Sequence, residues 1–412
     1  MAEPAMILTD QKLIEEFFPY RNNQLLLAEK LSKIMNADER NLFMQYINIL
    51  PKVREKFGFD AVCDRLAFEQ ATAKDISQWK SSLWASGVEV ADLCCGMGGD
   101  SFFIRDSVHS IGVDIDENRV AFFNENMCRL GLTNKAIVQN ALEYKGGDFF
   151  CIDPARRNAG SDKRIGLNPP FESVLEVSKK YAGGMIKLPP AFPESELPLN
   201  SEVVYLGGAN DCRECLAIFN ANLLSGRFSE LPKNNIGNIH AVSIVNGDVY
   251  KWQFPKTELS FINLKVKNLG AFIFEPNPVL VRSHLFLSEA HKFGLWQIDS
   301  SLAYLSGDAP ISTSPTSQKN GFSAYRIIDQ SGLSTGAVKT MLKKHNAGKI
   351  TLKKRGVEVV PEQEIKRLAP KGENEFVLFY TRIMGEKRAI LAMPSIPYLR
   401  KFAEIQEMQS TR

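Results

Sequence analysis

The sequence predicts an α/β protein of several domains, with an all-helical N-terminal domain, a central parallel sheet and smaller α+β modules after it. Three observations support this prediction. Helical periodicity covers residues 1–85, short apolar runs alternate with amphipathic stretches from Val88 onward, and short strand and helix patterns return beyond residue 320. The length of 412 residues fits two to four domains of about 100–200 residues each.

The N-terminal part has apolar residues at helical spacing, such as Leu13 and Phe17, and no strand-like alternation. Asn36-Ala37-Asp38 offers an N-cap to a further helix that contains Phe43 and Ile47. We therefore expect a helical domain over residues 1–85.

Strand-like runs follow, and helical-looking segments such as Glu117–Gly131 separate most of them. The runs are Val88–Leu93, Ser110–Ile115, Ala136–Gln139, Asp148–Ile152, Gly184–Leu188, Glu202–Leu206 and Ile239–Val245. This alternation predicts a parallel sheet covered on both faces. Asn246-Gly247-Asp248 joins the last run to Val249–Phe254 as a hairpin, so we expect one antiparallel element to close a Rossmann-like domain over residues 86–256.

Residues 257–320 are expected to connect this domain to the C-terminal part, and the Ser-, Thr-, Gly- and Pro-rich segment Ser306–Lys319 reads as a linker. Beyond it, strands and helices are clear again and predict a small α+β module over residues 321–396, with a tail over 397–412. The elements are strand Ala324–Asp329, helix Thr335–His345, strand Lys349–Lys354, helix Pro361–Leu368 and the hairpin Phe376–Ile383 with Arg388–Met393.

Composition excludes several classes of protein. No apolar run approaches the roughly 18 residues of a membrane helix, and the start of the chain lacks the pattern of a secretory signal. Seven scattered cysteines favour reduced thiols over a disulfide framework. We therefore expect a cytoplasmic protein that contacts no membrane.

The net charge of +3 hides an asymmetry along the chain. Residues 321–412 hold 17 Lys and Arg against 9 Asp and Glu, a net of +8, and the other residues carry 33 against 38, a net of −5. An asymmetry of this kind indicates an appendage that binds a polyanion.

A glycine-rich turn, Asp92–Asp100, follows the first strand directly, where open α/β sheets bind ligands. Gly96 and Gly98 would let the backbone approach a ligand closely. Position 101 is Ser, so the turn is not the dinucleotide pattern, and it lacks the Lys and Ser/Thr of a phosphate-binding loop. A tight turn without a ligand is the alternative reading.

Two further positions follow at the ends of the next strands. Asp114, 22 residues after Asp92, would accept hydrogen bonds from ribose hydroxyls, and Asn140-Ala141 would meet an adenine ring. Asp92 would face an ammonium group. Together these positions resemble the class I S-adenosylmethionine-dependent methyltransferases, and the resemblance implies this cofactor and no metal. It implies as cofactor-binding residues Asp92, Cys94, Gly96, Gly98, Asp114, Ile115, Asn140 and Ala141.

The segment before the first strand often covers the cofactor in that superfamily, which assigns such a role to Gln70 and Thr72. A helix N-cap at Thr72, among ordinary surface residues, is the alternative. The cysteines of the turn are expected to fill space. Lys187 ends the fifth strand at the same edge of the sheet and could reach the site, but a solvated or loop-anchoring lysine is the favoured interpretation. Cys212-Arg213-Glu214-Cys215 is expected to supply structural thiols at the start of a helix.

The fourth strand ends in Asp153-Pro154-Ala155-Arg156-Arg157, where amino methyltransferases typically have Asp/Asn-Pro-Pro-aromatic. The carboxylate would accept from the substrate amine, and proximity would supply most of the rate. The arginines suit phosphate or an anionic substrate, or one forms a salt bridge in the loop. Asn168-Pro169-Pro170-Phe171 is a second candidate motif, expected in a loop, whose Phe171 could stack on a base. The predicted catalytic residues are Asp153, Pro154, Arg156 and Phe171.

The residues Asp92–Asp100 and Gly112–Asp116 also resemble the trimethylguanosine synthase branch of RNA methyltransferases, from which Ala155-Arg156-Arg157 departs. Over nearly the full length, the chain is more similar to bacterial methyltransferases with a C-terminal THUMP-like domain. The matching segments are Glu69–Thr72, Asp153–Arg157, Glu275-Pro276-Asn277-Pro278 and Lys353-Lys354-Arg355-Gly356. That resemblance implies a ferredoxin-like piece within residues 257–320 and a THUMP-like module that binds RNA.

Phosphate contacts in that module are expected from Lys343, Lys344, Lys353, Lys354 and Arg355. A solvated charged face is the plainer reading of these residues. The leading prediction is a methyltransferase that acts on a base nitrogen of a structured RNA. The alternatives are a methyltransferase for DNA or a small anionic molecule, and a catalytically inactive protein that binds the cofactor and RNA.

Overall fold

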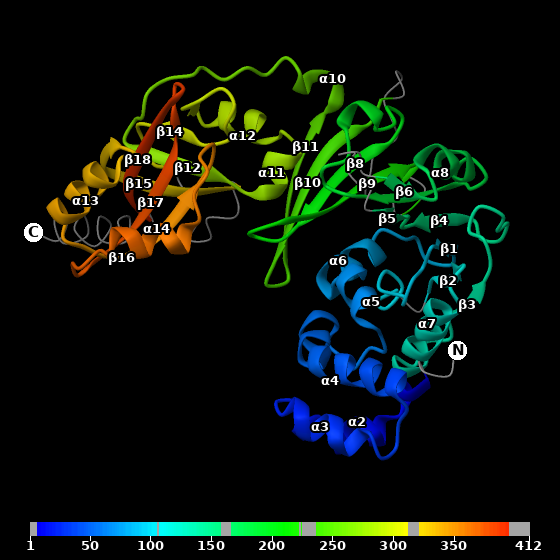
Figure 1. Ribbon diagram of the computed structural model, residues 1–412. Helices are drawn as coiled ribbons and strands as arrows, with labels where there is room; N and C mark the ends of the chain where they lie inside the picture. Colours follow the sequence, from blue (N-terminus) through cyan, green and yellow to red (C-terminus); the bar gives the residue numbers. More distant parts are fainter. Residues whose placement is uncertain are drawn as a thin grey trace, which may run out of the picture. The chain divides into compact units, whose positions relative to one another are not determined.

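The computed structural model describes residues 6–104, 107–157, 166–221, 224, 236–311 and 321–394, except the side chains of Arg156 and Arg157. The chain forms two compact units, Met1–Val204 with Glu214–Gly237 and Tyr205–Arg213 with Asn238–Arg412 (Figure 1). The chain passes between the units within two strands, β8 and β9. The domain boundaries expected near residues 85, 256, 320 and 396 stay predictions.

The first unit begins with helices and continues as an α/β sheet. Its helices are α2 (Gln11–Phe17), α3 (Gln24–Leu31), α4 (Ala37–Phe57), α5 (Arg65–Gln70), α6 (Lys74–Ser81), α7 (Glu117–Arg129) and α8 (Phe171–Ser178). Its strands are β1 (Glu89–Leu93), β2 (His109–Asp114), β3 (Lys135–Val138), β4 (Phe149–Ile152), β5 (Ala155–Arg157), β6 (Gly166–Asn168), β7 (Gly183–Leu188), β8 (Glu202–Gly207) and β9 (Cys212–Phe219). The predicted N-terminal helices are thus confirmed.

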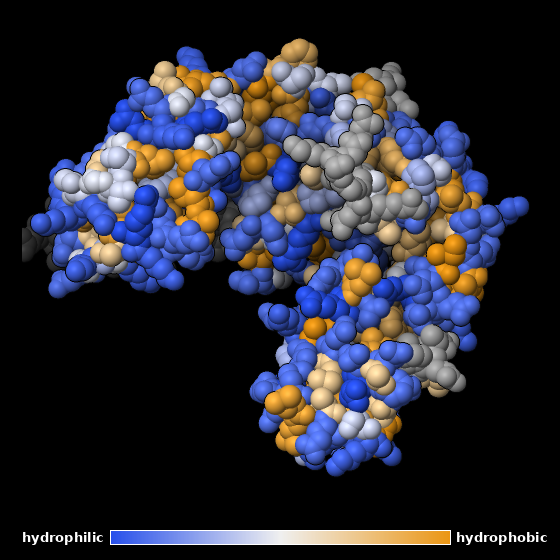
Figure 2. Space-filling model, in the orientation of Figure 1, coloured by the Kyte–Doolittle hydropathy of each residue, from blue (hydrophilic) through white to orange (hydrophobic). Residues whose placement is uncertain are grey.

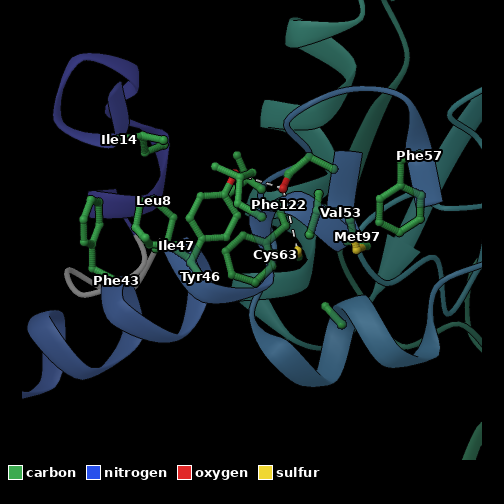
Figure 3. Packing of buried hydrophobic residues seen from close by; sticks show 14 of the residues in the cluster. Leu8, Ile14, Phe43, Tyr46, Ile47, Val53, Phe57, Cys63, Met97 and Phe122 are labelled. Carbon is green, nitrogen blue, oxygen red and sulfur yellow. Dashed lines mark hydrogen bonds between the residues drawn. The ribbon is translucent and has the colours of Figure 1, made fainter. Parts of the chain in front are cut away.

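Helix α4 shows why the sequence forms helices here. The side chain of Asn36 accepts a hydrogen bond from the backbone N–H of Glu39, and the carboxylate of Glu39 accepts one from the backbone N–H of Asn36. The expected N-cap is therefore a full capping box. Gly58 ends the helix in the left-handed conformation, with φ +83°. The apolar face of α4 packs into a core that also contains residues of α7 and of the glycine-rich turn, and Figure 3 shows Tyr46 near Phe122 in this core.

The main sheet has nine strands in the order β11-β10-β8-β9-β7-β4-β1-β2-β3, where β10 is Asn238–Val245 and β11 is Asp248–Pro255. Strand β1 pairs in parallel with both β2 and β4, and β3 and β7 extend the sheet in parallel on either side. The expected hairpin is confirmed, because β10 and β11 pair antiparallel and end this sheet. Strand β9, which pairs antiparallel with β7, is a second antiparallel element that we did not expect.

The second unit contains the hairpin β10 (Asn238–Val245) and β11 (Asp248–Pro255) and a seven-stranded sheet of order β13-β14-β12-β15-β18-β17-β16. The other elements are α10 (Lys256–Leu259), β12 (Phe272–Pro276), α11 (Pro278–Arg282), α12 (Phe286–Lys292), β13 (Trp296–Gln297), β14 (Leu305–Gly307), β15 (Phe322–Gly332), α13 (Thr335–Lys344), β16 (Ala347–Lys354), α14 (Pro361–Leu368), β17 (Asn374–Ile383) and β18 (Glu386–Pro394). The predicted strands and helices beyond residue 320 are confirmed.

One difference concerns the expected linker. Ser306 and Gly307 belong to strand β14, which pairs with β12, and β12 pairs in turn with β15 of the C-terminal module. These strands carry buried apolar residues such as Phe274 and Leu305. The Ser-, Thr-, Gly- and Pro-rich composition that follows Leu305 hid the short strand β14. The rest of that expected linker, from residue 312 to 319, lies outside the described residues.

Candidate functional site

The candidate site lies at the carboxyl ends of β1 and β4, which are neighbours in the sheet. Leu93 pairs with Ile152, and the backbone N–H of Asp153 donates to the carbonyl oxygen of Leu93 over 3.2 Å. The glycine-rich turn and the Asp153-Pro154 motif therefore start side by side. This is the switch point of the sheet, because β1 pairs with β2 on its other side.

Two glycines of the turn have different roles. Gly96 has φ +55°, and a Cβ atom added there would meet nothing within 4 Å, so this part of the turn faces open space. Gly98 has φ +96°, and an added Cβ would lie 2.8 Å from Cε of Met127 and 3.0 Å from the ring of Phe123. Gly98 thus permits the close packing of the turn on α7, and Gly96 leaves the backbone accessible to a ligand.

The carboxyl group of Asp92 is buried at the base of this turn. It accepts a hydrogen bond of 2.6 Å from Oγ of Ser101. Burial and the nearby Asp100 raise the pKa of Asp92 to about 7. A buried carboxyl group whose negative charge is this poorly stabilised favours a cationic ligand group. Ser101 is the residue that departs from the dinucleotide pattern.

Asp114 braces the turn from the end of β2. One of its oxygens accepts from the N–H of Gly96 over 2.9 Å, and the other accepts from the N–H of Asp116 over 3.0 Å. Each carboxylate oxygen can accept a second hydrogen bond, so the group remains able to bind hydroxyls. The next residue, Ile115, is 75% exposed and offers an apolar surface beside it.

The other expected cofactor residues are held in local turns, buried, or exposed at a helix end. The amide of Asn140 closes a local turn, accepting from the N–H of Leu142 over 3.1 Å and donating to Glu143 over 3.0 Å. Ala141 is buried, and Gln70 is exposed at the end of α5. Cys94 lies in the turn with φ +57°, and burial raises the pKa of its thiol to about 12, so this cysteine is not a nucleophile.

The two candidate catalytic motifs meet in the structure. Strands β5 and β6 form an antiparallel ladder in which Ala155 pairs with Asn168. Asn168 was expected in a loop, and the ladder brings it next to the segment that follows Asp153-Pro154. Phe171 begins α8, and its ring centroid lies 4.8 Å from that of Phe192. The side chain of Arg156, the remaining predicted catalytic residue, lies outside the described residues.

Lys187 lies next to Asp153, as its place at the strand end allowed, and of the two plainer readings the solvated lysine is wrong. The side chain is buried at the end of β7, and its Nζ lies 2.6 Å from Oδ2 of Asp153 and 2.8 Å from Oγ1 of Thr72. Burial alone would lower the pKa of Lys187, but Asp153 and the neighbouring acids hold it well above its usual value. The lysine therefore stays protonated and cannot serve as a base.

The cluster continues behind Lys187 through residues that sequence reasoning missed. Glu214 of β9 lies 3.4 Å from Nζ of Lys187 and 3.0 Å from Nζ of Lys80, and Lys80 also pairs with Asp100 of the turn. Burial would raise the pKa of Asp100, but Lys80 and Lys187 lower it to about 2. A charged residue that borders or interrupts an apolar run, as Glu214 does before Cys215–Ile218 in β9, is the signal that could have found this part of the cluster.

Two alternative readings are also corrected. Thr72 is not a helix N-cap, because Ala73 occupies that position in α6 and the hydroxyl of Thr72 donates to Glu214 over 3.0 Å. Cys212 and Cys215 lie in strand β9 rather than at the start of a helix. The apolar run Cys215–Ile218 fits a buried strand, and the polar Arg213 and Glu214 before it resembled a helix start.

The comparisons with known proteins agree with this geometry. The THUMP domain-like family matches residues 322–394. An uncharacterised S-adenosylmethionine-dependent methyltransferase of Mycobacterium tuberculosis is 24% identical over 330 residues, which are 77% of this chain and 83% of the relative. A candidate methyltransferase of Porphyromonas gingivalis has a crystal structure with a TM-score of 0.70 at 18% identity, over 93% of this chain and 98% of its own. The last comparison shows the shared fold.

The chain therefore shares the fold of class I methyltransferases, is similar over most of its length to S-adenosylmethionine-dependent methyltransferases, and carries a C-terminal match to the THUMP domain-like family. The predicted fold class and the predicted resemblance are thereby confirmed.

Most of the predicted RNA-contacting residues of the THUMP-like domain have partners within the protein. Lys344 pairs with Asp329 over 2.7 Å, and Lys353 pairs with Glu275. Lys354 donates to the carbonyl oxygen of Val359, and the guanidinium of Arg355 lies over the ring of Tyr304. The remaining residue, Lys343, is exposed on α13.

Helix α13 presents a second exposed lysine, Lys339, one turn before Lys343. Figure 2 shows mostly hydrophilic residues over this end of the domain.

Neither a metal centre nor a membrane span is found in the part of the chain that the structure describes. In residues 6–394, outside the gaps given above, no group of three or more His, Cys, Asp or Glu side chains could hold a metal ion. Over the same residues, none of the helices combines the length and hydrophobicity needed to cross a bilayer.

Proposed function

We propose that the methyltransferase methylates a base nitrogen of a structured RNA. The observation that carries this proposal is the β5–β6 ladder, which joins the Asp153-Pro154 motif to Asn168-Pro169-Pro170-Phe171 at the carboxyl end of β4. Together the two segments supply an acceptor, a second polar group and an aromatic ring, the three elements that a site for an aromatic amine requires.

S-adenosylmethionine fits the residues at the neighbouring turn. Asp92 would pair with its ammonium group, Gly96 leaves room for it, Asp114 would accept from the ribose hydroxyls, and Ile115 would pack on the adenine. When bound, this cofactor supplies a methyl group on a positively charged sulfur. The buried acids around the turn outnumber the lysines, which suits a ligand with net positive charge.

The chain's own residues would orient the acceptor nitrogen. The carboxylate of Asp153 would accept a hydrogen bond from the amine. Asn168 pairs with Ala155 in the adjacent ladder, and Phe171 would offer a ring for stacking. Holding the amine by its hydrogens directs the nitrogen lone pair to the methyl group, and the displaced proton leaves to water. Lys187 stays protonated, so it does not take up this proton.

The THUMP-like domain and its charge favour RNA as the substrate. The net charge of +8 over residues 321–412 supports binding of a polyanion, and the match to THUMP domain-like sequences covers most of the same residues. A methyltransferase for DNA or a small anionic molecule remains the second candidate, because the two arginines after Ala155 also suit such substrates.

Transfer of tritiated methyl groups onto total RNA, total DNA and a small-molecule extract tests this proposal. Labelling of RNA by the wild type, lost in Asp153→Ala, is the expected result. Labelling of DNA or a small molecule alone would overturn the RNA proposal in favour of the second candidate. Binding of S-adenosylmethionine without labelling of any fraction would indicate an inactive binding protein.

A further inference from the structure

One buried lysine holds the carboxylate that ends β4. Lys187 is 5% exposed and binds Oδ2 of Asp153, whose side chain is 35% exposed. Parallel pairing of Ile152 with Ile186 places the two residues next to each other at the edge of the sheet. Asp153 therefore has a closed side at Lys187 and an open side that a substrate can reach.

Lys187 is fixed in turn by groups from other elements. Its Nζ lies 2.8 Å from Oγ1 of Thr72, which precedes α6, and 3.4 Å from Oε1 of Glu214 in β9. Thr72 also donates to Glu214 over 3.0 Å. An ammonium group has three donors, and here three acceptors surround it, so the position of Lys187 is set by its surroundings.

We propose that Lys187 is a positioning residue that binds one oxygen of Asp153 and thereby presents the other oxygen to the substrate amine. Thr72 and Glu214 hold the lysine in place. The inference rests on the proposed function, since Asp153 is the acceptor there, and it adds a residue that contacts neither the substrate nor the cofactor. It also gives the segment before α6 a role in the reaction site.

The charges around Asp153 determine what removal of Lys187 would do. The titratable groups that face this carboxylate are Lys187 of β7, Asp92, Cys94 and Asp100 of the turn, Cys151 of β4 and Glu214 of β9. Within the part of the chain that the structure describes, Lys187 is the one cation among these groups, and the other ionised groups disfavour a charged Asp153. Without Lys187, the carboxylate would take up a proton at higher pH, and turnover would be lost from the acid side.

The test compares Lys187→Met and Lys187→Arg with Lys80→Met, a matched buried lysine that pairs with Asp100 and Glu214 but not with Asp153. Methyl transfer to total RNA is measured from pH 5.5 to 9, and binding of S-adenosylhomocysteine is measured by calorimetry. For Lys187→Met we expect kcat to fall about 10²-fold and the acid limb to move up by about one pH unit.

The other variants and readouts separate positioning from a general loss of structure. Lys187→Met should bind S-adenosylhomocysteine within about threefold of the wild type, because Lys187 touches none of the residues proposed to hold the cofactor's methionine and ribose groups. Lys187→Arg should recover part of kcat, and Lys80→Met should keep the wild-type acid limb. If Lys187→Met does not fold, Thr72→Val serves instead and should lower kcat without moving the acid limb, because the lysine remains.

An unchanged acid limb in Lys187→Met, or the same shift in Lys80→Met, would overturn the inference. Failure of the proposed function is distinguishable, because it would appear in the wild type as an absence of labelled RNA. In that case the melting temperatures of Lys187→Met, Asp153→Asn and the double variant still test the pairing. Additive changes in those temperatures would show that the two side chains do not act on each other.

Discussion

Ala155 pairs with Asn168 across the β5–β6 ladder, so two motifs that are 15 residues apart in the chain lie next to each other. From the sequence they competed for one role, because each looks like the Asp/Asn-Pro motif of an amino methyltransferase. The structure instead allows both to act on the same substrate, with Asp153 at the strand end and Asn168 beside the next segment.

Substitutions at both motifs should therefore reduce turnover. We expect Asp153→Asn to lower kcat about 10²-fold or more, because an amide is a weaker acceptor and no longer pairs with Lys187. Asn168→Ala should lower kcat less, about tenfold, because it removes a neighbouring polar group. Steady-state kinetics on RNA, with calorimetry of S-adenosylhomocysteine binding, separates a loss of turnover from a loss of cofactor affinity.

A matched control is Glu176→Gln on α8, whose carboxylate pairs with Lys179 on an exposed surface of the same region. This variant should behave as the wild type. If Asn168→Ala kept full activity while Asp153→Asn lost it, the second motif would have no part in the reaction.

The sequence allowed the strands, their order along the chain and the positions of Asp92, Asp114 and Asp153 to be predicted, because each rests on a local pattern. A polar residue directly after an apolar run marks the edge of a parallel sheet wherever the run lies. The hairpin β17–β18 and the helix α13 were predictable for the same reason, since their turn and capping residues are close in the chain.

The buried cluster was not predictable in this way. The cluster combines the loop before α6 with α6, β7 and β9, so its residues meet only after the sheet has formed; they are Thr72, Lys80, Lys187 and Glu214. The order of β9 within the sheet is another non-local property, and without it Glu214 cannot be placed near Lys187. The partners of two predicted phosphate-contacting lysines were missed for a related reason, because Glu275 lies 78 residues from Lys353 and Asp329 lies 15 residues from Lys344.

The two glycines of the turn should respond differently to alanine. Gly96→Ala has room for a methyl group but a strained φ of +55°, so we expect a cost of about 1 kcal/mol in the free energy of unfolding and a clear loss of cofactor affinity. Gly98→Ala would drive a methyl group into Met127 and Phe123 and should destabilise the fold more, by about 2–4 kcal/mol. Denaturant unfolding and calorimetry give the two quantities.

The affinity of Gly96→Ala for the cofactor product tests the role of this glycine. Equal affinity of Gly96→Ala and the wild type for S-adenosylhomocysteine would show that the cofactor does not approach this part of the turn. Gly247→Ala, in the hairpin turn between β10 and β11, is a suitable control for the strain alone, because it has φ +87° and no neighbour within 4 Å.

RNA binding should depend on α13 more than on the end of β16. The double variant Lys339→Glu/Lys343→Glu places acidic groups on an exposed face, so we expect weaker binding to total small RNA and a smaller dependence on salt, by about one to two units of slope. Lys353→Met removes the partner of Glu275 and should lower the melting temperature with little change in that slope.

Filter binding at salt concentrations between about 50 and 200 mM measures the salt dependence of each variant, because phosphate contacts weaken strongly over this range. Lys12→Glu, an exposed lysine of α2, controls for the change in total charge. The assignment of the RNA-binding surface to α13 would be wrong if the Lys339/Lys343 variant and the Lys12 variant lost affinity equally.

Asp92 should link cofactor binding and stability to pH. The pKa of its carboxyl is about 7 in the folded protein against an ordinary value of 3.8, so the folded state binds a proton that the unfolded state has already lost between these values. The free energy of unfolding contributed by this group therefore falls as pH rises through that window and is lowest above pH 7. Asp92→Asn removes the buried charge and should raise the melting temperature at pH 8 by a few degrees, with the gain shrinking toward pH 4.

The same variant should bind S-adenosylhomocysteine about tenfold more weakly at pH 8, because the ammonium group loses its counter-charge, and about equally at pH 5.5, where the wild-type carboxyl is also protonated. Melting curves and calorimetry at the two pH values, with the exposed Asp248→Asn as control, would contradict this role if affinity and stability changed in the same direction at pH 8.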